Sequence, residues 1–400
     1  MTKNLLRNPL RRISRTLCRN LCLLAGLAAS SQIMAEAKPL KVYILAGQSN
    51  MQGQAKVETI ERLQYEGGDL EMYKAMTGDD GKPDAPEGVY GVYFSNGDIR
   101  KGEPRPLLEK AGPLLPGFAE DPGPKERFGP AYTFGIYMHK HLNEPILIIK
   151  TAWGGRNLMQ QFRPPSAGPY EQDKDGHGNP TGAYYQHMVK HVKDVLADPG
   201  KYHPGYDADQ GAELAGFVWF QGFNDMIGPY PEKDFSEYTR LMATLIKDLR
   251  KDLNAPNLPT VIGVMGIGGP IEDESDKQFH FRKAQAATGS LPEFQDNVTI
   301  VQTAPLWDME LERIMNKLNK AAEEKAIADK PDLADKPRAL RGAIKDWSKK
   351  IASKVLTEEE LKVYETGKSN QAFHYMGSAL TYGRIGRAFA DAMHELSTKD

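Results

Sequence analysis

Residues 40–51 read LKVYILAGQSNM, and this stretch decides the fold class and points to the chemistry. The apolar, β-branched run 40–46 is typical of a buried strand. It ends at Gly47, so that Ser49 stands at the carboxyl end of the strand. A serine in that position can be exposed and close to free backbone N–H groups of the next turn, as a nucleophile requires. The alternative is that Ser49 only caps the helix that follows.

Further short apolar runs follow the first one, and helix-length stretches separate them. The runs are 145–151, 215–220, 260–265 and 298–303, and the helical stretches are 132–142, 184–196, 235–253 and 277–288. Apolar runs of this length between helices indicate parallel strands that are buried on both faces. The sequence therefore predicts an α/β fold with helices on both faces of a parallel sheet, closed by an amphipathic helix near residues 385–393. Catalytic groups should lie at the carboxyl ends of the strands.

Two stretches depart from this alternation. Residues 77–127 are dense in glycine, proline and charge, and we expect a long irregular excursion there. Residues 309–366 are rich in Lys, Glu, Ala and Leu, which predicts an added helical hairpin or small helical subdomain. The predicted organisation is thus a main domain of residues 38–308 and 367–400, interrupted by a helical insertion at 309–366.

The amino terminus has the pattern of a secretory signal peptide. Six basic residues precede a short apolar run, and Ala35-Glu36-Ala37 offers a cleavage site. The run is too short to span a bilayer, so we expect export to the periplasm or the extracellular space, with no membrane anchor. Without residues 1–37 the chain keeps 45 basic and 52 acidic residues, a formal charge of about −7 that does not favour nucleic acid as a partner.

Both cysteines, Cys18 and Cys22, fall inside the predicted leader. The mature chain would have no cysteine, which excludes thiol catalysis and thiolate metal sites. About 360 residues can bury enough surface to be stable without disulfides.

Two later segments could supply an oxyanion hole for a serine nucleophile. After the second run comes Trp153-Gly154-Gly155-Arg156, in which the N–H of Gly155 could face an oxyanion. After the third comes Gln221-Gly222-Phe223-Asn224, in which either amide could donate a further hydrogen bond. The alternatives are a tight strand-to-helix turn and amides that satisfy loop backbone.

A general base is also needed, and His374 is the best placed of nine histidines. It lies in the last loop before the terminal helix, from which an imidazole can reach a serine at the end of the first strand. His187 and His191 have metal-binding spacing but no neighbouring acid to complete a zinc site. Residues 173–179 imitate the start of a calcium loop, yet Tyr184 stands where the bidentate glutamate is expected. We expect no metal at either place.

Taken in order, the GQSNM, WGG and QGFND segments and the late histidine resemble the SGNH hydrolases. The closest branch is the sialate O-acetylesterase-like one, which includes the acetylxylan esterases of carbohydrate esterase family 6. The resemblance covers most of residues 40–308 and 370–395. It implies a three-layer α/β/α sandwich with a parallel, flavodoxin-like sheet, and hydrolysis of O-acetyl esters on sugars without a cofactor.

The resemblance also implies roles for residues. Ser49 matches the nucleophile, His374 the base and Gly155 an oxyanion donor. The third donor is Gln221 or Asn224, and in this branch the glutamine is the commoner choice. The substrate would be an acetylated oligo- or polysaccharide, with Gln48, Trp153, Arg156 and Arg163 as candidate sugar-binding residues, although an arginine there could equally be a surface residue.

The sequence departs from the family pattern at two positions. Gln371 stands where an aspartate usually orients the histidine, and Phe223 stands where this branch usually has glutamate. The orienting group could then be a backbone carbonyl, Asn370 or an acid from elsewhere, of which Asp308 is the first candidate. These departures motivate the rival hypothesis, a carbohydrate-binding protein on a degenerate esterase scaffold. The leading hypothesis is an exported serine esterase that works through an acyl-enzyme.

Overall fold

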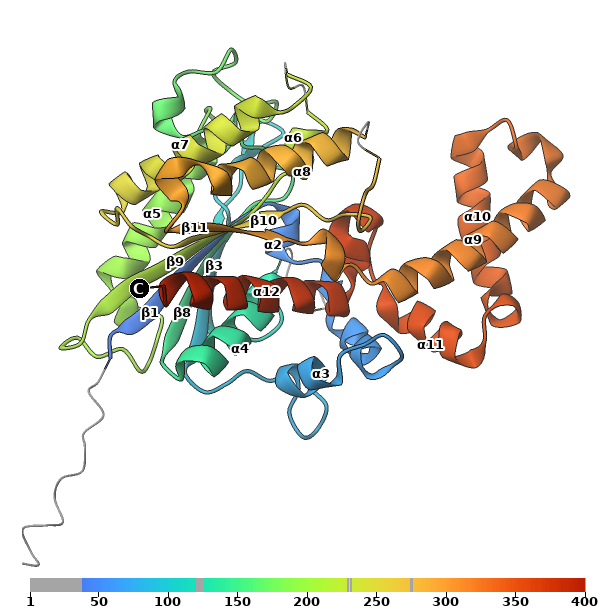
Figure 1. Ribbon diagram of the computed structural model, residues 1–400, viewed down its shortest axis with the longest axis horizontal. Coiled ribbons are helices and arrows are strands. Elements are labelled where there is room, and N and C mark those ends of the chain that lie inside the picture. Colours follow the sequence, from blue (N-terminus) through green and yellow to red (C-terminus); the bar gives the residue numbers. More distant parts are fainter. Residues whose placement is uncertain (1–37, 120–125, 229, 231, 274–275, 400) are drawn as a thin grey trace, which may run out of the picture. The chain divides into compact units, whose positions relative to one another are not determined.

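A seven-stranded, mostly parallel sheet forms the centre of the protein (Figure 1). The computed structural model describes residues 38–119, 126–228, 230, 232–273 and 276–399. The chain divides into Met1–Lys38 and Pro39–Asp400, and the sheet with its helices belongs to the second unit. The predicted signal peptide, residues 1–37, lies outside the described residues.

The strand order is β11-β10-β9-β1-β8-β3-β6, which places the first strand at the centre of the sheet. β1 (Leu40–Gly47) pairs in parallel with β8 (Ile146–Ala152) on one side and β9 (Ala212–Phe220) on the other. Six of its eight residues are completely buried or nearly so in an unbroken run, as the sequence pattern predicts. Two further parallel strands continue the sheet beyond β9, namely β10 (Thr260–Val264) and β11 (Val298–Gln302). All five predicted strands are confirmed.

Helices cover both faces of this sheet and make the three-layer arrangement that the sequence predicts (Figure 1). One layer holds α4 (Pro130–Leu142) and α12 (Ala379–Ser397), which pack against each other. The opposite layer holds α5 (Ala183–Ala197), α7 (Ser236–Asp252) and α8 (Lys277–Ala287). The buried residues of α12 recur at helical spacing, so this helix turns one apolar face to the sheet.

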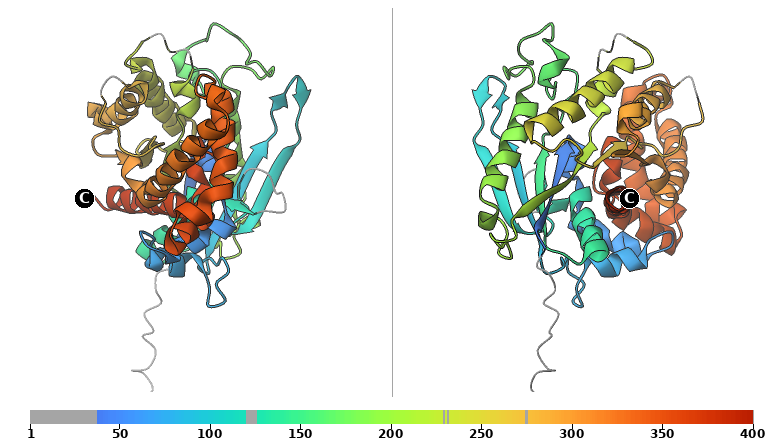
Figure 2. Two further views of the ribbon diagram at one scale, coloured as in Figure 1. Left: turned by 90° about the vertical axis from the view of Figure 1, so that its right-hand side faces the viewer. Right: turned by 60° about the vertical axis from the view of Figure 1, so that its left-hand side comes forward.

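The prediction of an irregular excursion over residues 77–127 is wrong. This segment contains β3 (Val89–Asn96), which pairs in parallel with β8, and β6 (Leu107–Pro113), which pairs antiparallel with β3 at the edge of the sheet. β6 lacks an apolar pattern because nearly every residue in it is exposed. The hairpin of β3 and β6 extends away from the helical layers (Figure 2), and its tip holds β4 (Ile99–Arg100) and β5 (Glu103–Pro104).

Residues 309–367 form three helices beside the sheet (Figure 1). They are α9 (Met309–Asp329), α10 (Pro337–Val355) and α11 (Glu358–Gly367). α11 contacts the 3₁₀ segment η1 (Val57–Gln64), which connects this helical segment to the main domain. No helix among the described residues is both long enough and apolar enough to cross a bilayer.

Short elements complete the fold. They are the helices α2 (Ser49–Gln52), α3 (Leu70–Met76) and α6 (Phe223–Met226), the strands β2 (Ala55–Lys56) and β7 (Arg127–Phe128), and the 3₁₀ segments η2 (Pro165–Ala167), η3 (Pro199–Lys201), η4 (Thr288–Ser290), η5 (Pro292–Phe294), η6 (Ala304–Leu306), η7 (Pro331–Leu333) and η8 (Ala372–Gly377). Two of them, α2 and α6, directly follow β1 and β9, at the edge where the candidate site lies.

Candidate active site

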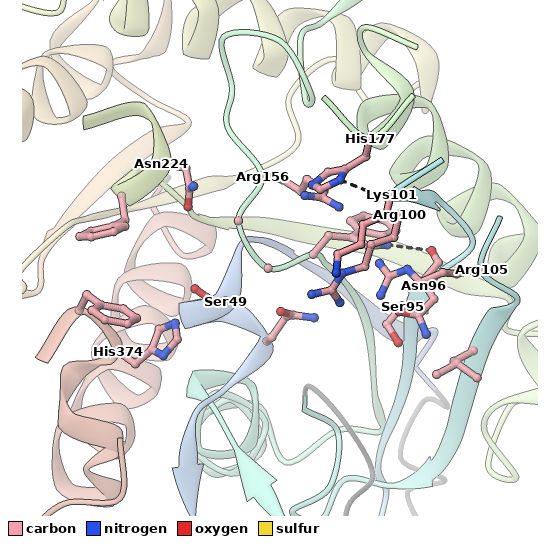
Figure 3. A pocket seen from close by; sticks show the side chains of 17 residues that line it. Ser49, Ser95, Asn96, Arg100, Lys101, Arg105, Arg156, His177, Asn224 and His374 are labelled. Carbon is pink, nitrogen blue, oxygen red and sulfur yellow. Dashed lines mark hydrogen bonds between the residues drawn. The ribbon is translucent and has the colours of Figure 1, made fainter. Parts of the chain in front are cut away.

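A cavity of about 700 Å³ opens at the carboxyl ends of β1, β8 and β3 (Figure 3). It brings together six of the residues that the sequence predicts to be functional, although they are up to 325 positions apart along the chain. These six are Ser49, Trp153, Gly155, Arg156, Asn224 and His374. Four other predicted residues, Gln48, Arg163, Gln221 and Asp308, do not line this cavity.

Ser49 is the first residue of α2, immediately after the sharp turn at the end of β1. The turn requires glycine at position 47, because a Cβ there would lie 2.1 Å from the carbonyl oxygen of Phe220. Neither Ser49 nor the N-cap residue Gln48 makes a side-chain capping hydrogen bond to this helix, so the capping alternative is not observed. Ser49 lines the cavity and is 7% exposed, as suits a nucleophile that substrate can reach.

Two backbone amides near Ser49 are candidate oxyanion donors. Within the described residues, neither the N–H of Ser49 nor that of Gly155 donates to a protein acceptor. Gly155 has a φ of +74°, and a Cβ at this position would meet nothing within 4 Å, because the residue borders the cavity. Its left-handed conformation favours glycine and leaves the amide accessible to a substrate.

The side-chain donor in the cavity is Asn224, and the sequence-based preference for Gln221 is wrong. Gln221 is buried, and its Nε2 donates to Gln48 Oε1 at 3.2 Å, to the Arg156 carbonyl at 3.0 Å and to Asp225 Oδ2. These contacts leave Gln221 no N–H for a substrate. Asn224 lines the cavity, and its Oδ1 accepts a hydrogen bond from Gln48 Nε2 at 2.9 Å. Because Oδ1 is engaged by Gln48, Nδ2 is the group of the Asn224 amide that is left to donate.

Asp225 connects the two segments that carry the candidate oxyanion donors Gly155 and Asn224. Its carboxylate accepts hydrogen bonds from the backbone N–H groups of Leu158 and Met159 and from the hydroxyl of Tyr230. Burial raises the pKa of Asp225, while the hydrogen bonds from Tyr230 and Gln221 oppose that rise. This buried carboxylate links the loop after β8 to the turn after β9, so it supports the site without reaching the cavity.

His374 is held at the cavity by a tightly turned loop, η8. The two residues after it, Tyr375 and Met376, have φ values of +49° and +55°, a conformation that side-chain-bearing residues adopt at a cost. The buried ring of Tyr375 secures this backbone, because its hydroxyl accepts from the Gly266 N–H at 2.8 Å and contacts Thr303 Oγ1 at 2.8 Å. Both Ser49 and His374 point into the cavity (Figure 3).

Asn370 provides the hydrogen-bond partner at the back of the imidazole. His374 Nδ1 lies 3.2 Å from Asn370 Oδ1, an acceptor that selects the tautomer in which Nδ1 carries the proton and Nε2 can act as a base. This amide was one of the alternatives that the sequence left open. The side chain at the family's aspartate position, Gln371, is exposed.

The placement of Asp308 behind His374 is wrong. Asp308 is 3% exposed and forms a bidentate ion pair with Arg62, with Nε–Oδ2 and Nη2–Oδ1 distances of 2.9 and 3.0 Å. Its Oδ1 also accepts from the Leu311 N–H and caps α9. A carboxylate engaged by a fully buried guanidinium has a structural role here, which is to join the helical segment to η1.

Two of the four candidate sugar-binding residues are also corrected. Gln48 is 2% exposed, and both ends of its amide are hydrogen-bonded to the turn after β9. Arg163 donates to the carbonyls of Gly168, Met159 and Ala167, so it holds a loop together. Trp153 and Arg156 line the cavity, and their role in sugar binding stays a prediction. Trp153 donates to the Asn96 carbonyl, and Arg156 pairs with Asp98 at 3.0 Å.

The wall opposite Ser49 is basic, a feature that was not predicted from the sequence. It consists of Arg100, Lys101 and Arg105 from the hairpin tip together with Arg156 (Figure 3). Arg105 and Arg156 both pair with Asp98, whose carboxylate is buried. Burial alone would raise the pKa of Asp98, but hydrogen bonds from Tyr184 and these arginines lower it, so the carboxylate is charged. The basic run was visible in the sequence, but it lay in a segment interpreted as an excursion.

Arg100 and Lys101 add two more positive charges to this wall. Both side chains are exposed, and neither pairs with an acidic side chain in the described part of the protein. No aspartate or glutamate among the described residues lines the cavity. Four cations against the one carboxylate of Asp98 leave this side of the site positively charged.

The two motifs that imitate metal sites contact other parts of the protein. Asp175 accepts hydrogen bonds from Gln161 Nε2 and from the N–H groups of His177 and Asn179, which makes residues 173–179 a polar turn. His191 is buried, with its ring stacked 4.3 Å from that of Phe94. Among the residues that the structure describes, no three His, Cys, Asp or Glu side chains gather as a metal-binding group.

Comparison with known proteins identifies the family to which the chain belongs. Residues 39–313 match the model of a family described as carbohydrate esterase, sialic acid-specific acetylesterase, and the chain belongs to this family. A probable carbohydrate esterase from Arabidopsis thaliana is 30% identical over 98 residues, which are 24% of this chain and 36% of that relative. The matched stretch thus spans little more than a third of the relative's length.

Three solved structures are similar to parts of this chain at low sequence identity. A protein from Arabidopsis thaliana is 21% identical, with a TM-score of 0.36, over 67% of this chain and 87% of its own. A carbohydrate acetylesterase from Xanthomonas citri is 16% identical, with a TM-score of 0.39, over 65% and 49% of the two chains. NanS is 14% identical, with a TM-score of 0.35, over 66% and 78%.

Proposed function

We propose that this protein is an exported serine esterase that removes O-acetyl groups from a carbohydrate through an acyl-enzyme. The observation that carries the proposal is the meeting of Ser49, His374 and the three candidate donor groups in one cavity. Membership of the carbohydrate esterase family supports the reaction class. Export is proposed from the pattern of residues 1–37.

The first half of the reaction acetylates the enzyme. Ser49 Oγ attacks the ester carbonyl while His374 Nε2 takes its proton, and Asn370 Oδ1 holds the imidazole by Nδ1. The N–H groups of Ser49 and Gly155 and the Nδ2 of Asn224 stabilise the oxyanion. The tetrahedral intermediate then collapses, and the C–O bond to the sugar breaks. The sugar oxygen receives the proton from His374 and leaves as an alcohol.

The second half of the reaction restores the free enzyme. A water molecule attacks the acetyl carbonyl on Ser49 while His374 again accepts a proton, and the same donors stabilise the second oxyanion. Collapse of this intermediate returns the proton to Ser49 Oγ and releases acetate. Because the sugar has already left, the cavity needs only to admit water at this stage.

The basic wall supports an acidic sugar as substrate. Arg100 and Lys101 face the cavity without acidic partners in the described residues, so a substrate carboxylate could pair with them. Arg105 and Arg156 are already paired with Asp98, so their attraction for a substrate carboxylate would be weaker. An acetylated sugar acid also fits the description of the family as sialic acid-specific. Phe373 and Leu108, two exposed apolar residues that also line the cavity, supply apolar surface on which a sugar ring can pack.

A non-catalytic carbohydrate-binding protein is the second candidate, and one observation favours it. The group behind His374 is an amide, which orients the ring without the negative charge that stabilises imidazolium. Such a protein would keep the cavity and its basic wall but would not turn over ester substrates.

Release of p-nitrophenol from p-nitrophenyl acetate distinguishes the two candidates. The wild type and Ser49→Ala are compared with Ser353→Ala, a control at an exposed serine of α10. We expect Ser49→Ala to lose activity with little change in melting temperature, because the residue borders a cavity and its hydroxyl makes no hydrogen bond to a described residue. The control should match the wild type. Equal rates for wild type and Ser49→Ala would contradict the esterase proposal and favour the binding protein.

A further inference from the structure

The side chain of Gln48 connects the nucleophile turn to the turn that carries Asn224. It belongs to the residue directly before Ser49, yet it points away from the cavity and is 2% exposed. Its Oε1 accepts hydrogen bonds from Gln221 Nε2 at 3.2 Å, from the Gly222 N–H at 3.2 Å and from the Asn224 N–H at 3.3 Å. Three donors on one oxygen fix the orientation of the Gln48 amide.

That orientation determines which end of the Asn224 amide faces the cavity. With Gln48 Oε1 held by three donors, Gln48 Nε2 is left to donate, and it donates to Asn224 Oδ1 at 2.9 Å. Asn224 can accept this hydrogen bond only through its oxygen, so its Nδ2 group is turned the other way. Within the described residues Nδ2 has no protein acceptor, and Asn224 lines the cavity near Ser49 (Figure 3). An oxyanion needs an N–H at this place, whereas an amide oxygen would repel it.

We propose that Gln48 is a positioning residue that fixes the amide of Asn224 in the orientation needed for oxyanion stabilisation. This inference rests on the proposed esterase function and adds a residue to it that does not touch the substrate. The chain of contacts runs from Gln221 and Gly222 through Gln48 to Asn224, and only the last member reaches the reacting atoms. Ser49 and its oxyanion donor are thereby aligned by one side chain.

The variant Gln48→Glu tests this proposal because glutamate has the same shape and lacks the donor. Its carboxylate can still accept from Gln221, Gly222 and the Asn224 N–H. It cannot donate to Asn224 Oδ1, so Asn224 should rotate and donate Nδ2 to the new carboxylate instead. The amide oxygen would then face the oxyanion. We expect kcat for p-nitrophenyl acetate to fall about a hundredfold or more, with KM little changed, since loss of one oxyanion donor has an effect of this size.

The pH profile separates orientation from simple structural damage. A buried carboxylate at position 48 would lie close to Asp225, and burial and like charge both favour its protonated form. Once protonated, it can donate to Asn224 Oδ1 and restore the original orientation. The ratio of kcat for Gln48→Glu to kcat for wild type should therefore rise as the pH falls. A variant that is merely damaged would keep a constant ratio.

A double-mutant comparison shows whether Gln48 acts through Asn224. In the Asn224→Ala background there is no amide to orient, so adding Gln48→Glu should change kcat by less than about threefold. Gln186→Glu, at an exposed position of α5, is the matched control and should behave as wild type. If Gln48→Glu does not fold, Gln48→Met takes its place in both backgrounds, with the same expectation that its loss disappears when Asn224 is replaced by alanine.

Each outcome decides between the claims. A wild type that hydrolyses no acetyl ester refutes the proposed function and, with it, this role for Gln48. An active wild type with Gln48→Glu within about threefold of its kcat overturns the inference alone. So does a loss that multiplies with that of Asn224→Ala. A loss confined to kcat, reduced at low pH and absent in the Asn224→Ala background supports it.

Discussion

The hydrogen bond between His374 and Asn370 leads to a prediction whose size the structure sets. An aspartate that orients a catalytic histidine is worth about 10⁴ in turnover in the serine-protease template. Here the orienting atom is the neutral amide oxygen of Asn370, 3.2 Å from Nδ1 and on a half-buried side chain. A neutral hydrogen bond contributes about 0.5–1.5 kcal/mol net. We therefore expect Asn370→Ala to lower kcat only about twofold to tenfold.

The complementary variant, Asn370→Asp, should change the pH dependence as well as the rate. A carboxylate beside the ring favours imidazolium, which raises kcat and moves the acid limb of the pH–rate profile to higher pH. A neighbouring carboxylate raises the pKa of a histidine by about one to three pH units. Because this site is partly exposed, we expect the acid limb to move by about one pH unit. The assay is kcat/KM for p-nitrophenyl acetate from acidic to neutral pH. Gln371→Ala is the control and should behave as wild type, because that side chain is exposed.

Two results would refute this account of the base. If Asn370→Ala lost about 10³-fold or more, the amide would be acting as a charged partner does. If Asn370→Asp kept the wild-type rate and pH profile, position 370 would not lie behind the ring at all.

Further predictions concern the rest of the structure. Asp308→Ala should destabilise the protein by about 3–5 kcal/mol, because it leaves the buried guanidinium of Arg62 without its ion-pair partner. The molecules that do fold should keep the wild-type specific activity. Denaturant unfolding measures the first effect and active-site titration the second. Burial lowers the pKa of Lys150 to about 7, from 10.5 in the unfolded chain. Between these two values the unfolded chain binds one proton more than the folded protein, so the free energy of unfolding of the wild type should rise with pH across this window relative to that of Lys150→Met. Melting curves at several pH values measure this difference. Arg100→Glu combined with Lys101→Glu should raise KM for an acidic acetylated sugar at least about tenfold and leave p-nitrophenyl acetate hydrolysis nearly unchanged, and steady-state kinetics at low salt test it.

The central sheet could be predicted because its strands carry their own signal. Residues 40–46 and 145–151 are apolar almost throughout, since parallel strands at the centre of a sheet are buried on both faces. The hairpin at the sheet edge could not be predicted in the same way. Residues 107–113 are exposed almost throughout, so nothing in their composition distinguishes a strand from a loop, and their pairing with β3 is a property of the tertiary structure.

The sequence could predict those site residues that belong to motifs at the ends of strands. Ser49, Gly155 and Asn224 follow strands, and the topology of a parallel sheet places such positions at one edge. Side-chain pairing was not predictable, because the partner of a carboxylate or amide can lie anywhere along the chain. Asp308 is paired with Arg62, 246 positions earlier, and a residue number cannot reveal that its charge is already engaged.

The basic wall was missed for a related reason. The three basic side chains of the hairpin tip approach Arg156 only because β3 lies beside β8 in the sheet. A cluster of Arg and Lys within six residues was the available signal. It becomes informative about function once the two neighbouring strands are known.

Acetate release from an O-acetylated sugar acid tests the central claim most directly, with the wild type compared with Ser49→Ala and with Ser353→Ala. In a quenched reaction of the wild type, peptide mass analysis should also find one acetyl group on Ser49. Release of acetate by the wild type and Ser353→Ala but not by Ser49→Ala, with the acetyl group on the Ser49 peptide, is the result that we predict. Release by Ser49→Ala at the wild-type rate, or no release from any acetylated carbohydrate by the wild type, would contradict it.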